Sequence, residues 1–387
     1  MAAKFLLANQ SFGPYFLALA ERLAARGHEV ITLSGEDVPL TGSAIRHVRG
    51  PSYRRESLRA RAQSWGKFLW FAARELPRWG GGATVLTTSN PPLLPHVCAR
   101  VLRGRAKQVA WIFDLYPAAL AGNPKVASLP LLAPLWRWGN RRAYRQCAAV
   151  ATLGAEMAAM LAKDTGNHAP LVRPLWHTLG GAQPLARLDH PWRREMEIGE
   201  RLVVFYAGNL GVSHDLDILV RAAALLKAED QVRFVVMGEG PKREELREQV
   251  RTAGVEKLFH FLPRQTEELL PLALNLGDLA VVSIKPGLER VMMPSKTYNN
   301  LAAGSAILAV AREPSDLTHV VRQEKCGLVV EPGDAAGLAA TVRQIAEDPT
   351  ALLALRERAR RVAVEKFSPS IQCEEMTKLL ETVAGSS

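Results

Sequence analysis

Short apolar strands alternate with amphipathic helices along this chain, and this alternation restricts its fold more than any other feature. The pattern predicts parallel sheets, because helical crossovers return each strand in the same direction and cover both faces of the sheet. A first series of strands is expected at residues 4–8, 29–33, 84–88, 108–113 and 148–153. A second series is expected at residues 201–207, 233–237, 258–261, 279–283, 306–310 and 328–330.

A proline-rich stretch separates the two series. Residues 166–200 contain four prolines with several glycines, a composition typical of a linker. With 387 residues the chain also exceeds one typical hydrophobic core, so two domains are expected. We predict an α/β protein with two Rossmann-like parallel-sheet domains and a C-terminal helix that crosses back to the first domain. The predicted boundaries are residues 1–180, a linker at 181–200, residues 201–365 and the helix at 366–387.

Composition narrows the class of protein. The hydrophobic content of 48% excludes a disordered chain, and no run approaches the 18 uncharged apolar residues of a spanning helix. The four cysteines form no CxxC pair, which favours a reducing cytoplasm and argues against zinc. Residues 1–190 hold 24 Lys+Arg against 10 Asp+Glu, or +14, whereas the remainder of the +11 total is −3. The first half is therefore expected to meet an anionic partner: nucleic acid, a membrane surface or a phosphorylated substrate.

The segment from Tyr53 to Trp79 reads as one basic amphipathic helix. An apolar stripe runs from Leu58 to Leu76 at spacings of four and three, and seven arginines and lysines lie off it. With three tryptophans, such a helix suits a membrane interface. The alternative is a helix that covers the first sheet and keeps its arginines in water. The stripe consists of Leu58, Ala62, Trp65, Leu69, Ala72 and Leu76.

Residues 289–310 are the most informative short segment. Glu289 reads as a loop carboxylate, Pro294 suits the first turn of a helix, Ser295 can cap that helix, and Lys296 adds a positive charge. The backbone N–H groups of a helix start face any anion that docks there, so the segment suits a nucleotide diphosphate. The alternative is an ordinary helix cap in an ordinary αβ unit.

Several segments resemble the family 4 retaining glycosyltransferases of the GT-B fold, in which two Rossmann-like domains face a cleft. Within this family the chain is similar to a subgroup that transfers sugars in bacterial surface-polysaccharide assembly and includes WbuB-like N-acetylfucosamine transferases. The similar segments are TTSNPPLLPHV (87–97), WIFDLYP (111–117) and the PSK…LAAG pattern. The family segments are RGHEVITLSG (26–35), FYAGNLGVSHDLDILVRAAALL (205–226), FVVMGEGPKREELREQV (234–250) and FLPRQTEELLPLALNLGDLAVVSIKPGLERVMMPSKTYNNLAAGSAILAV (261–310).

The chain departs from the family pattern at three places. Asn209 and His214 stand where the family has an Arg and a Lys that grip the donor diphosphate. Glu289 matches the first of the family's two glutamates, whereas Asn299 stands at the second place. The glycine-rich loop after the first strand is reduced to SFGP at residues 11–14.

The resemblance implies a donor site in the second domain and an acceptor site in the first. Glu289 and Lys296 are the expected catalytic residues of the donor side, and Asp114, which follows a buried strand, is expected to accept the proton of the acceptor hydroxyl. Phe12, Gly13, Ser89 and Asn90 are expected to line the acceptor cleft. The expected donor-binding residues are Gly208, Asn209, Gly211, His214, Gly238, Arg290, Pro294, Ser295 and Asn299.

The function implied is sugar transfer from a nucleotide-diphosphate donor to a membrane-associated, polyprenyl-linked glycan. UDP is the expected nucleotide, and guanosine is the alternative base that the sequence leaves open. No metal or cofactor is expected, because no DxD-like pair ends a strand of the second domain. No nucleic-acid partner is expected either, because the sequence has no helix-turn-helix, aromatic platform or basic repeat. The protein is expected in the cytoplasm, peripheral on the inner face of the membrane. An anionic lipid surface would attract its basic first half. One alternative is a non-catalytic GT-B protein that binds sugar nucleotides or partners in an assembly complex. A sugar-nucleotide epimerase is a further alternative, but it would need acid/base carboxylates from both domains, which the sequence does not show.

Overall fold

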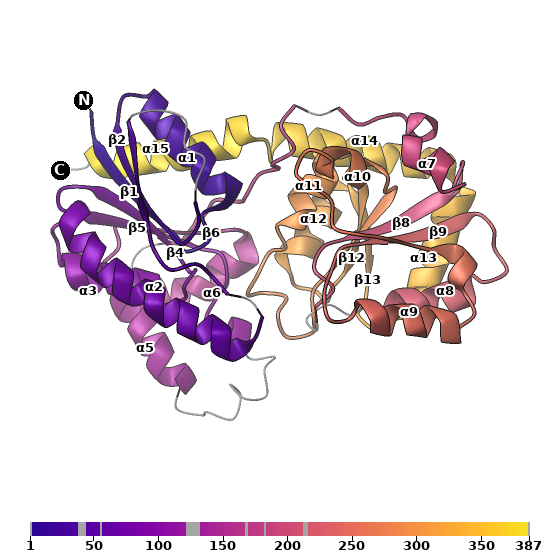
Figure 1. The fold of residues 1–387 in the computed structure, drawn as a ribbon, viewed down its shortest axis with the longest axis horizontal. Helices are drawn as coiled ribbons and strands as arrows, with labels where there is room; N and C mark the ends of the chain where they lie inside the picture. Colours follow the sequence, from indigo (N-terminus) through magenta and orange to yellow (C-terminus); the bar gives the residue numbers. More distant parts are fainter. Residues whose placement is uncertain are drawn as a thin grey trace. The chain divides into compact units, whose positions relative to one another are not determined.

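The computed structural model describes residues 2–37, 44–54, 56–120, 132–166, 169–181, 183–211 and 216–385 (Figure 1). It divides into two compact units. The first unit comprises residues 1–175, 290–293 and 369–387, and the second comprises residues 176–289 and 294–368. Each unit is built on one parallel sheet, so the expected α/β architecture is confirmed.

The first unit has a seven-stranded sheet in the order β3-β2-β1-β4-β5-β6-β7, and every strand pair is parallel. The edge strands β3 and β7 were not expected from the sequence. Their residues IRHVR and LV are too polar or too few to show a buried-strand pattern. The strands are β1 (Lys4–Ala8), β2 (Glu29–Ser34), β3 (Ile45–Arg49), β4 (Thr84–Thr88), β5 (Lys107–Ile112), β6 (Ala149–Thr152) and β7 (Leu171–Val172).

Helices cover both faces of this sheet. The C-terminal helix α15 packs beside α1 on one face, and α2, α3, α5 and α6 form a layer on the other (Figure 1). Charge pairs join α15 to α1: Glu374 of α15 bonds Arg22 of α1 and Arg26, the residue after α1, at 2.8 Å. The helices are α1 (Gly13–Ala25), α2 (Leu58–Trp79), α3 (Leu94–Leu102), α5 (Leu132–Tyr144), α6 (Ala155–Thr165) and α15 (Pro369–Gly385), with a 3-10 turn, η1, at Ala118–Leu120.

Helix α2 covers the first sheet and exposes one aromatic side chain to solvent. Phe68, Ala72 and Leu76 are fully buried against the first core, whereas Trp70 is 65% exposed. The expected stripe is wrong at Ala62, which is exposed, whereas Ala72 and Leu76 are buried as expected. Phe68, which the expected stripe left out, is buried four residues before Ala72 and lies on the same helix face.

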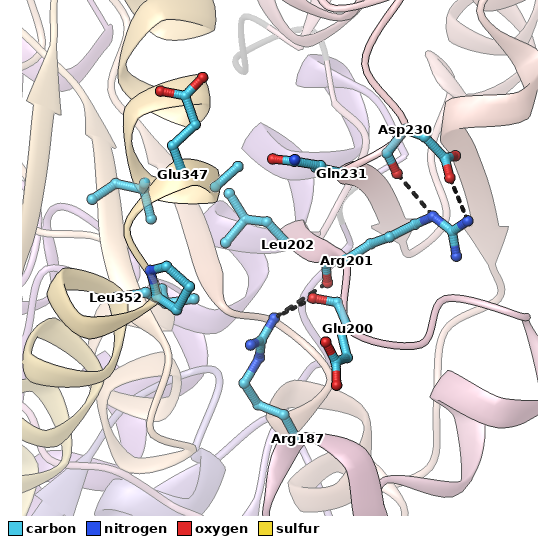
Figure 2. A pocket seen from close by; sticks show the side chains of 11 residues that line it. Arg187, Glu200, Arg201, Leu202, Asp230, Gln231, Glu347 and Leu352 are labelled. Carbon is cyan, nitrogen blue, oxygen red and sulfur yellow. Dashed lines mark hydrogen bonds and ion pairs between the residues drawn. The ribbon is translucent and has the colours of Figure 1, made fainter.

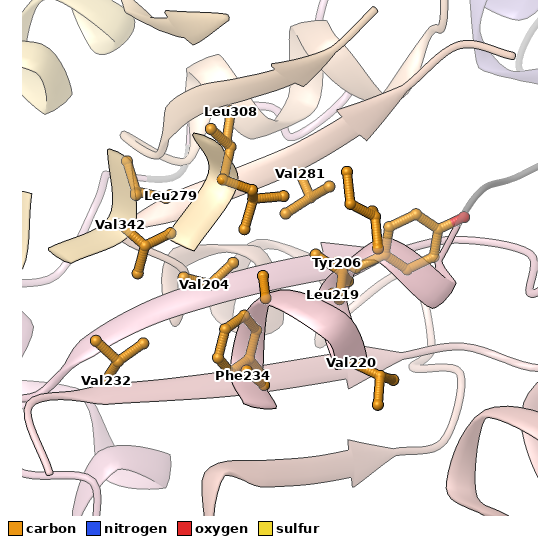
Figure 3. Close-up of a cluster of buried hydrophobic side chains, with 14 of the residues drawn as sticks. Val204, Tyr206, Leu219, Val220, Val232, Phe234, Leu279, Val281, Leu308 and Val342 are labelled. Carbon is orange, nitrogen blue, oxygen red and sulfur yellow. The ribbon is translucent and has the colours of Figure 1, made fainter. Parts of the chain in front are cut away.

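The second unit has a six-stranded sheet in the order β10-β9-β8-β11-β12-β13. Its apolar cluster joins the strands to α8, α9 and α13, and Figure 3 shows Val204, Phe234 and Val281 pointing into it. The strands are β8 (Leu202–Ala207), β9 (Val232–Met237), β10 (Phe259–Leu262), β11 (Leu279–Ser283), β12 (Ala306–Val310) and β13 (Gly327–Val330). The helices are α7 (Pro191–Glu195), α8 (Asp217–Leu225), α9 (Arg243–Thr252), α10 (Leu270–Asn275), α11 (Lys296–Ala302), α12 (Asp316–Glu324), α13 (Ala335–Glu347) and α14 (Pro349–Glu365), with 3-10 turns η2 (Arg187–Asp189) and η3 (Glu256–Leu258).

The proline-rich stretch packs on the second unit instead of forming a free linker. Arg187 and Arg193 bind the fully buried carboxylate of Asp278, which Arg356 of α14 also pairs with. These three arginines hold the pKa of that carboxyl below its usual range against the opposing effect of burial. A buried carboxylate needs such partners, so the stretch is fixed where the sequence suggested only a loop.

Candidate functional site

Two glycine turns meet at the carboxyl edge of the second sheet. The turn after β8 contains Gly208, and the turn after β9 contains Gly238, with φ values of +148° and +141°. A Cβ on Gly238 would collide with the carbonyl of Gly208, and a Cβ on Gly208 would lie 3.3 Å from Lys296 Nζ. Glycine is favoured at both places by the positive φ, and at Gly238 the neighbouring backbone also leaves no room for a side chain.

The ammonium of Lys296 lies at this edge, and none of the residues that the structure describes gives it an anionic partner. It sits 4.1 Å from the centroid of the Tyr206 ring, a cation–π contact. Its Nζ is shielded from solvent and has no hydrogen-bond partner among the described residues. Burial lowers the pKa of Lys296 to about 7. An unpaired buried cation of this kind is a binding group for an anion.

The carboxylate of Glu289 is also only half satisfied. The residue is 9% exposed, and its Oε2 accepts a 2.7 Å hydrogen bond from the Gly287 N–H. Within the described ranges its Oε1 is buried and has no hydrogen-bond partner, and the same holds for Ser283 Oγ at the end of β11 and Thr297 Oγ1 in α11. An unmade buried hydrogen bond costs about 1–3 kcal/mol, so each of these polar atoms is a candidate contact for a ligand.

Other predicted donor residues take lesser or different places. Asn209 is exposed, and its backbone carbonyl accepts the Tyr206 hydroxyl at 3.0 Å. Gly211 is buried, and His214 lies outside the described residues. Pro294 is half-buried and precedes α11, which begins at Lys296. The expected capping by Ser295 is wrong: its backbone is helical, so its side chain makes no cap hydrogen bond.

The structure gives Asn299 a structural partner. Its Oδ1 accepts a 2.7 Å hydrogen bond from the Thr178 N–H, and its Nδ2 donates to Thr178 Oγ1 at 3.1 Å. Both ends of the amide are therefore engaged in fixing the segment that enters the second unit. The expected donor contact of Asn299 is therefore left to the second N–H of its Nδ2 group.

Arg290 belongs to the first unit instead of the donor edge of the second. Its Nε lies 2.9 Å from the Glu156 carboxylate of α6, and the next residue, Val291, accepts a hydrogen bond from the Leu115 N–H. The interpretation of Arg290 as a diphosphate ligand overlooked this acidic partner, which lies far away in the sequence.

The carboxyl edge of the first sheet holds Asp114 just after β5. Burial raises the pKa of Asp114 to about 6, although the nearby Arg61 opposes this change. The residue sits in an isolated bridge with Met292. A carboxylate with a pKa near neutrality is suited to accept a proton.

The other predicted acceptor residues mainly build this edge. Ser89 Oγ accepts the N–H groups of Phe113 and Asp114 at 3.0 and 3.1 Å, and the Asn90 carbonyl accepts the Gln10 N–H. Phe12 is a correction: it is 2% exposed and packs on Phe16, so it belongs to the core. Gly13 begins α1 at a positive φ of 58° and is exposed.

Sequence reasoning missed Tyr206, Ser283 and Thr297. Tyr206 and Ser283 stand inside apolar strand patterns, and Thr297 stands inside a short helix, so each reads as a packing residue. For Tyr206 and Ser283 the available signal was their position at the end of a strand, since parallel sheets bind ligands at that edge.

A separate pocket of about 590 Å³ lies at the opposite end of β8, where Leu202 begins the strand (Figure 2). Figure 2 shows that its arginines already have partners: Arg201 pairs with Asp230, and Arg187 bonds the Glu200 carbonyl. The candidate donor residues do not line it. Over the described part of the chain, no helix is long and apolar enough to cross a membrane, and no cluster of three or more His, Cys, Asp or Glu could hold a metal ion.

Two parallel-sheet units with polar groups at their strand ends define the GT-B class of fold, and solved structures of that class match the whole chain. Sucrose-phosphate synthase of Thermosynechococcus elongatus has a TM-score of 0.78 at 18% identity, with 100% of both chains covered. Anabaena HepE, solved with UDP-glucose, has a TM-score of 0.74 at 14% identity, over 98% of this chain and 99% of HepE. At such identities the similarity establishes the fold alone.

Sequence comparison then gives the family. The model of the glycosyl transferase 4-like domain matches residues 12–195, and that of the glycosyl transferases group 1 matches residues 201–348. The chain belongs to the glycosyltransferases that combine these two domains. WcaI of Escherichia coli K12, named for colanic acid biosynthesis, is 27% identical over 49% of this chain and 46% of its own length. WbjE of Pseudomonas aeruginosa, named as a glycosyltransferase, is 27% identical over 75% of this chain and 72% of its own.

Proposed function

We propose that this protein transfers a hexosyl or N-acetylhexosaminyl group, with retention of configuration, from a UDP-linked donor to a lipid-linked glycan of a surface polysaccharide. The observation that carries the proposal is the buried Lys296 ammonium, which has no anionic partner among the described residues. A diphosphate supplies the missing charge. The structural relative HepE was solved with UDP-glucose, and the relative WcaI is named for a polysaccharide pathway. The WbuB-like subgroup remains a prediction from the sequence.

The proposed chemistry assigns one task to each group. As the bond from the sugar to the diphosphate breaks, negative charge grows on the leaving group, and Lys296 stabilises it. Glu289 holds donor-sugar hydroxyls through its unpaired Oε1. Asp114 accepts the proton of the attacking acceptor hydroxyl, and its raised pKa keeps it ionised but basic at neutral pH. Under this proposal the cation at Lys296 replaces a metal ion.

Exposed aromatic side chains support an acceptor held at a membrane. Trp70 on α2 is 65% exposed and Trp138 on α5 is 58% exposed, and both helices belong to the same layer of the first unit (Figure 1). Arg74 lies 4.9 Å from the Trp70 ring centroid, and Arg142 lies 5.9 Å from that of Trp138. Paired tryptophan and arginine side chains suit the headgroup region of an anionic bilayer.

Thermal shifts with nucleotide diphosphates and their sugars test the donor assignment. Uridine compounds should raise the melting temperature, since a ligand that binds only the folded state stabilises it by mass action. Slow hydrolysis of the bound donor should follow, which separates an enzyme from a non-catalytic binding protein. A chain that none of these compounds stabilises would contradict the proposal.

A further inference from the structure

Four aromatic side chains gather in the first unit around the carboxyl end of β5. Tyr53 and Trp65 are nearly parallel, with an interplanar angle of 6° and ring centroids 6.5 Å apart. Trp65 meets Tyr116 edge to face at 6.1 Å, and Tyr116 stacks with Trp136 at 6.0 Å and 13°. These residues come from separate parts of the chain: the segment before α2, α2 itself, the loop after β5, and α5. We call Tyr53, Trp65, Tyr116 and Trp136 the aromatic cluster.

The aromatic cluster differs from an ordinary core. All four side chains are half-buried, so each keeps some accessible surface. The indole Nε1 atoms of Trp65 and Trp136 are nevertheless shielded from solvent and have no hydrogen-bond partner among the described residues. A shielded indole N–H normally finds an acceptor, because leaving it unpaired costs free energy. Two such donors in one cluster indicate a ligand with acceptor oxygens.

Polar groups beside the aromatic cluster point the same way. Gln10 is fully buried, and no residue of the described ranges bonds its Oε1, while its Nε2 donates to the carbonyl of Ser64, the residue before Trp65. Arg61 lies 5.8 Å from the Trp65 ring centroid. Asp114 stands two residues before Tyr116 in the loop after β5, and Arg61 influences both residues electrostatically.

This combination matches the chemistry of a sugar ring. A pyranose presents C–H groups on its face, which pack on the electron-rich face of an aromatic ring, and hydroxyl oxygens at its rim. The rim oxygens can accept from indole N–H groups and donate to a glutamine oxygen or a carboxylate. A prenyl chain would leave both indole donors unpaired. A nucleoside diphosphate would need several cations around its phosphates.

We propose that the aromatic cluster is a binding subsite for a pyranose ring of the acceptor glycan, with its reactive hydroxyl toward Asp114. The inference rests on the proposed transfer reaction for the meaning of "acceptor", but binding of the sugar can be measured without turnover. Ring stacking by Trp65 and Trp136 then selects a cyclic sugar over an open-chain polyol.

The test is saturation-transfer difference NMR on the full chain with UDP present. The probes are the methyl glycosides of glucose, N-acetylglucosamine, fucose and N-acetylfucosamine, with sorbitol as an open-chain control. The structure provides a matched pair of variants on α5: Trp136→Leu removes a ring of the aromatic cluster, and Trp138→Leu removes an exposed ring two positions away. Tyr53→Ala, in an irregular segment, gives a second variant if Trp136→Leu lowers stability.

We expect at least one glycoside to bind, sorbitol not to bind, and Trp136→Leu or Tyr53→Ala to weaken binding roughly three- to tenfold. Trp138→Leu should leave the signal unchanged. The inference is overturned if no glycoside binds, if sorbitol binds equally well, or if both tryptophan variants have the same effect. UDP binding, followed by the melting temperature in the same samples, reports on the donor site separately. Loss of that binding would contradict the proposed function instead.

Discussion

Replacement of Lys296 by methionine should stabilise the ligand-free protein and abolish its affinity for nucleotide diphosphates. Methionine keeps most of the volume of lysine and can still pack on the Tyr206 ring, but it carries no buried charge. The stabilisation follows from the unpaired ammonium, whose pKa burial lowers from 10.5 to about 7. Between these two values the unfolded state binds more protons than the folded state, so the stability of the wild type rises with pH.

The size of the effect follows from that shift. One pKa unit corresponds to 1.36 kcal/mol, so the buried charge destabilises the fold by at most about 5 kcal/mol below pH 7. Structural relaxation and the contact with Tyr206 reduce this value, and a net gain of about 1–3 kcal/mol is expected for Lys296→Met near pH 6. The gain should shrink by roughly 1–3 kcal/mol between about pH 6 and pH 9, as the wild-type lysine loses its proton in the folded state.

Thermal unfolding of both proteins across this pH range checks the prediction. For a domain of this size, 1 kcal/mol moves the melting temperature by roughly 2–4 °C. Lys296→Arg, which keeps the charge, is the matched control and should not gain stability. A methionine variant that is less stable than the wild type at low pH, or that still binds UDP with unchanged affinity, would refute the reasoning.

The remaining predictions concern turnover and membrane binding. Glu289→Gln should lower kcat by about a hundred- to a thousandfold with an unchanged melting temperature, because one transition-state contact is lost; a near-wild-type rate would remove Glu289 from the site. Since a base acts when deprotonated, activity should fall as pH drops through about 6, the raised pKa of Asp114; a profile that stays flat below that value would contradict the assignment. A metal chelator should leave turnover unchanged; loss of turnover with the chelator, followed by its recovery when magnesium is added, would show that the enzyme needs a metal ion. The double variant Trp70→Ala/Trp138→Ala should co-sediment less with anionic vesicles, whereas equal recovery would argue against a membrane face.

The fold followed from the sequence because its signals are local. Buried parallel strands are continuous apolar runs, and the runs at residues 84–88, 279–283 and 306–310 coincide with the observed strands. The edge strand β3 was missed because its sequence IRHVR is polar on both sides. Its membership in the sheet depends on pairing with β2, which no local pattern reveals.

The site was only partly predictable, because its properties arise from distant contacts. The segment at 289–296 predicted Glu289 and Lys296 as site residues, but the burial that lowers the lysine pKa, and its contacts with Tyr206 and Gly208, arise from residues far away in the sequence. Asn299 shows the opposite case. Its motif position implied a ligand contact, whereas tertiary packing supplies Thr178 as its partner.

The most direct test of the account is release of UDP from UDP-sugars in the presence of bacterial membrane lipids. The account predicts that the wild type releases UDP, that extracted lipids carrying glycan acceptors accelerate the release, and that Lys296→Met abolishes it in a protein that remains folded. Folded wild-type protein that releases no UDP from any sugar donor, or a Lys296→Met variant that releases it at the wild-type rate, would contradict the central claim.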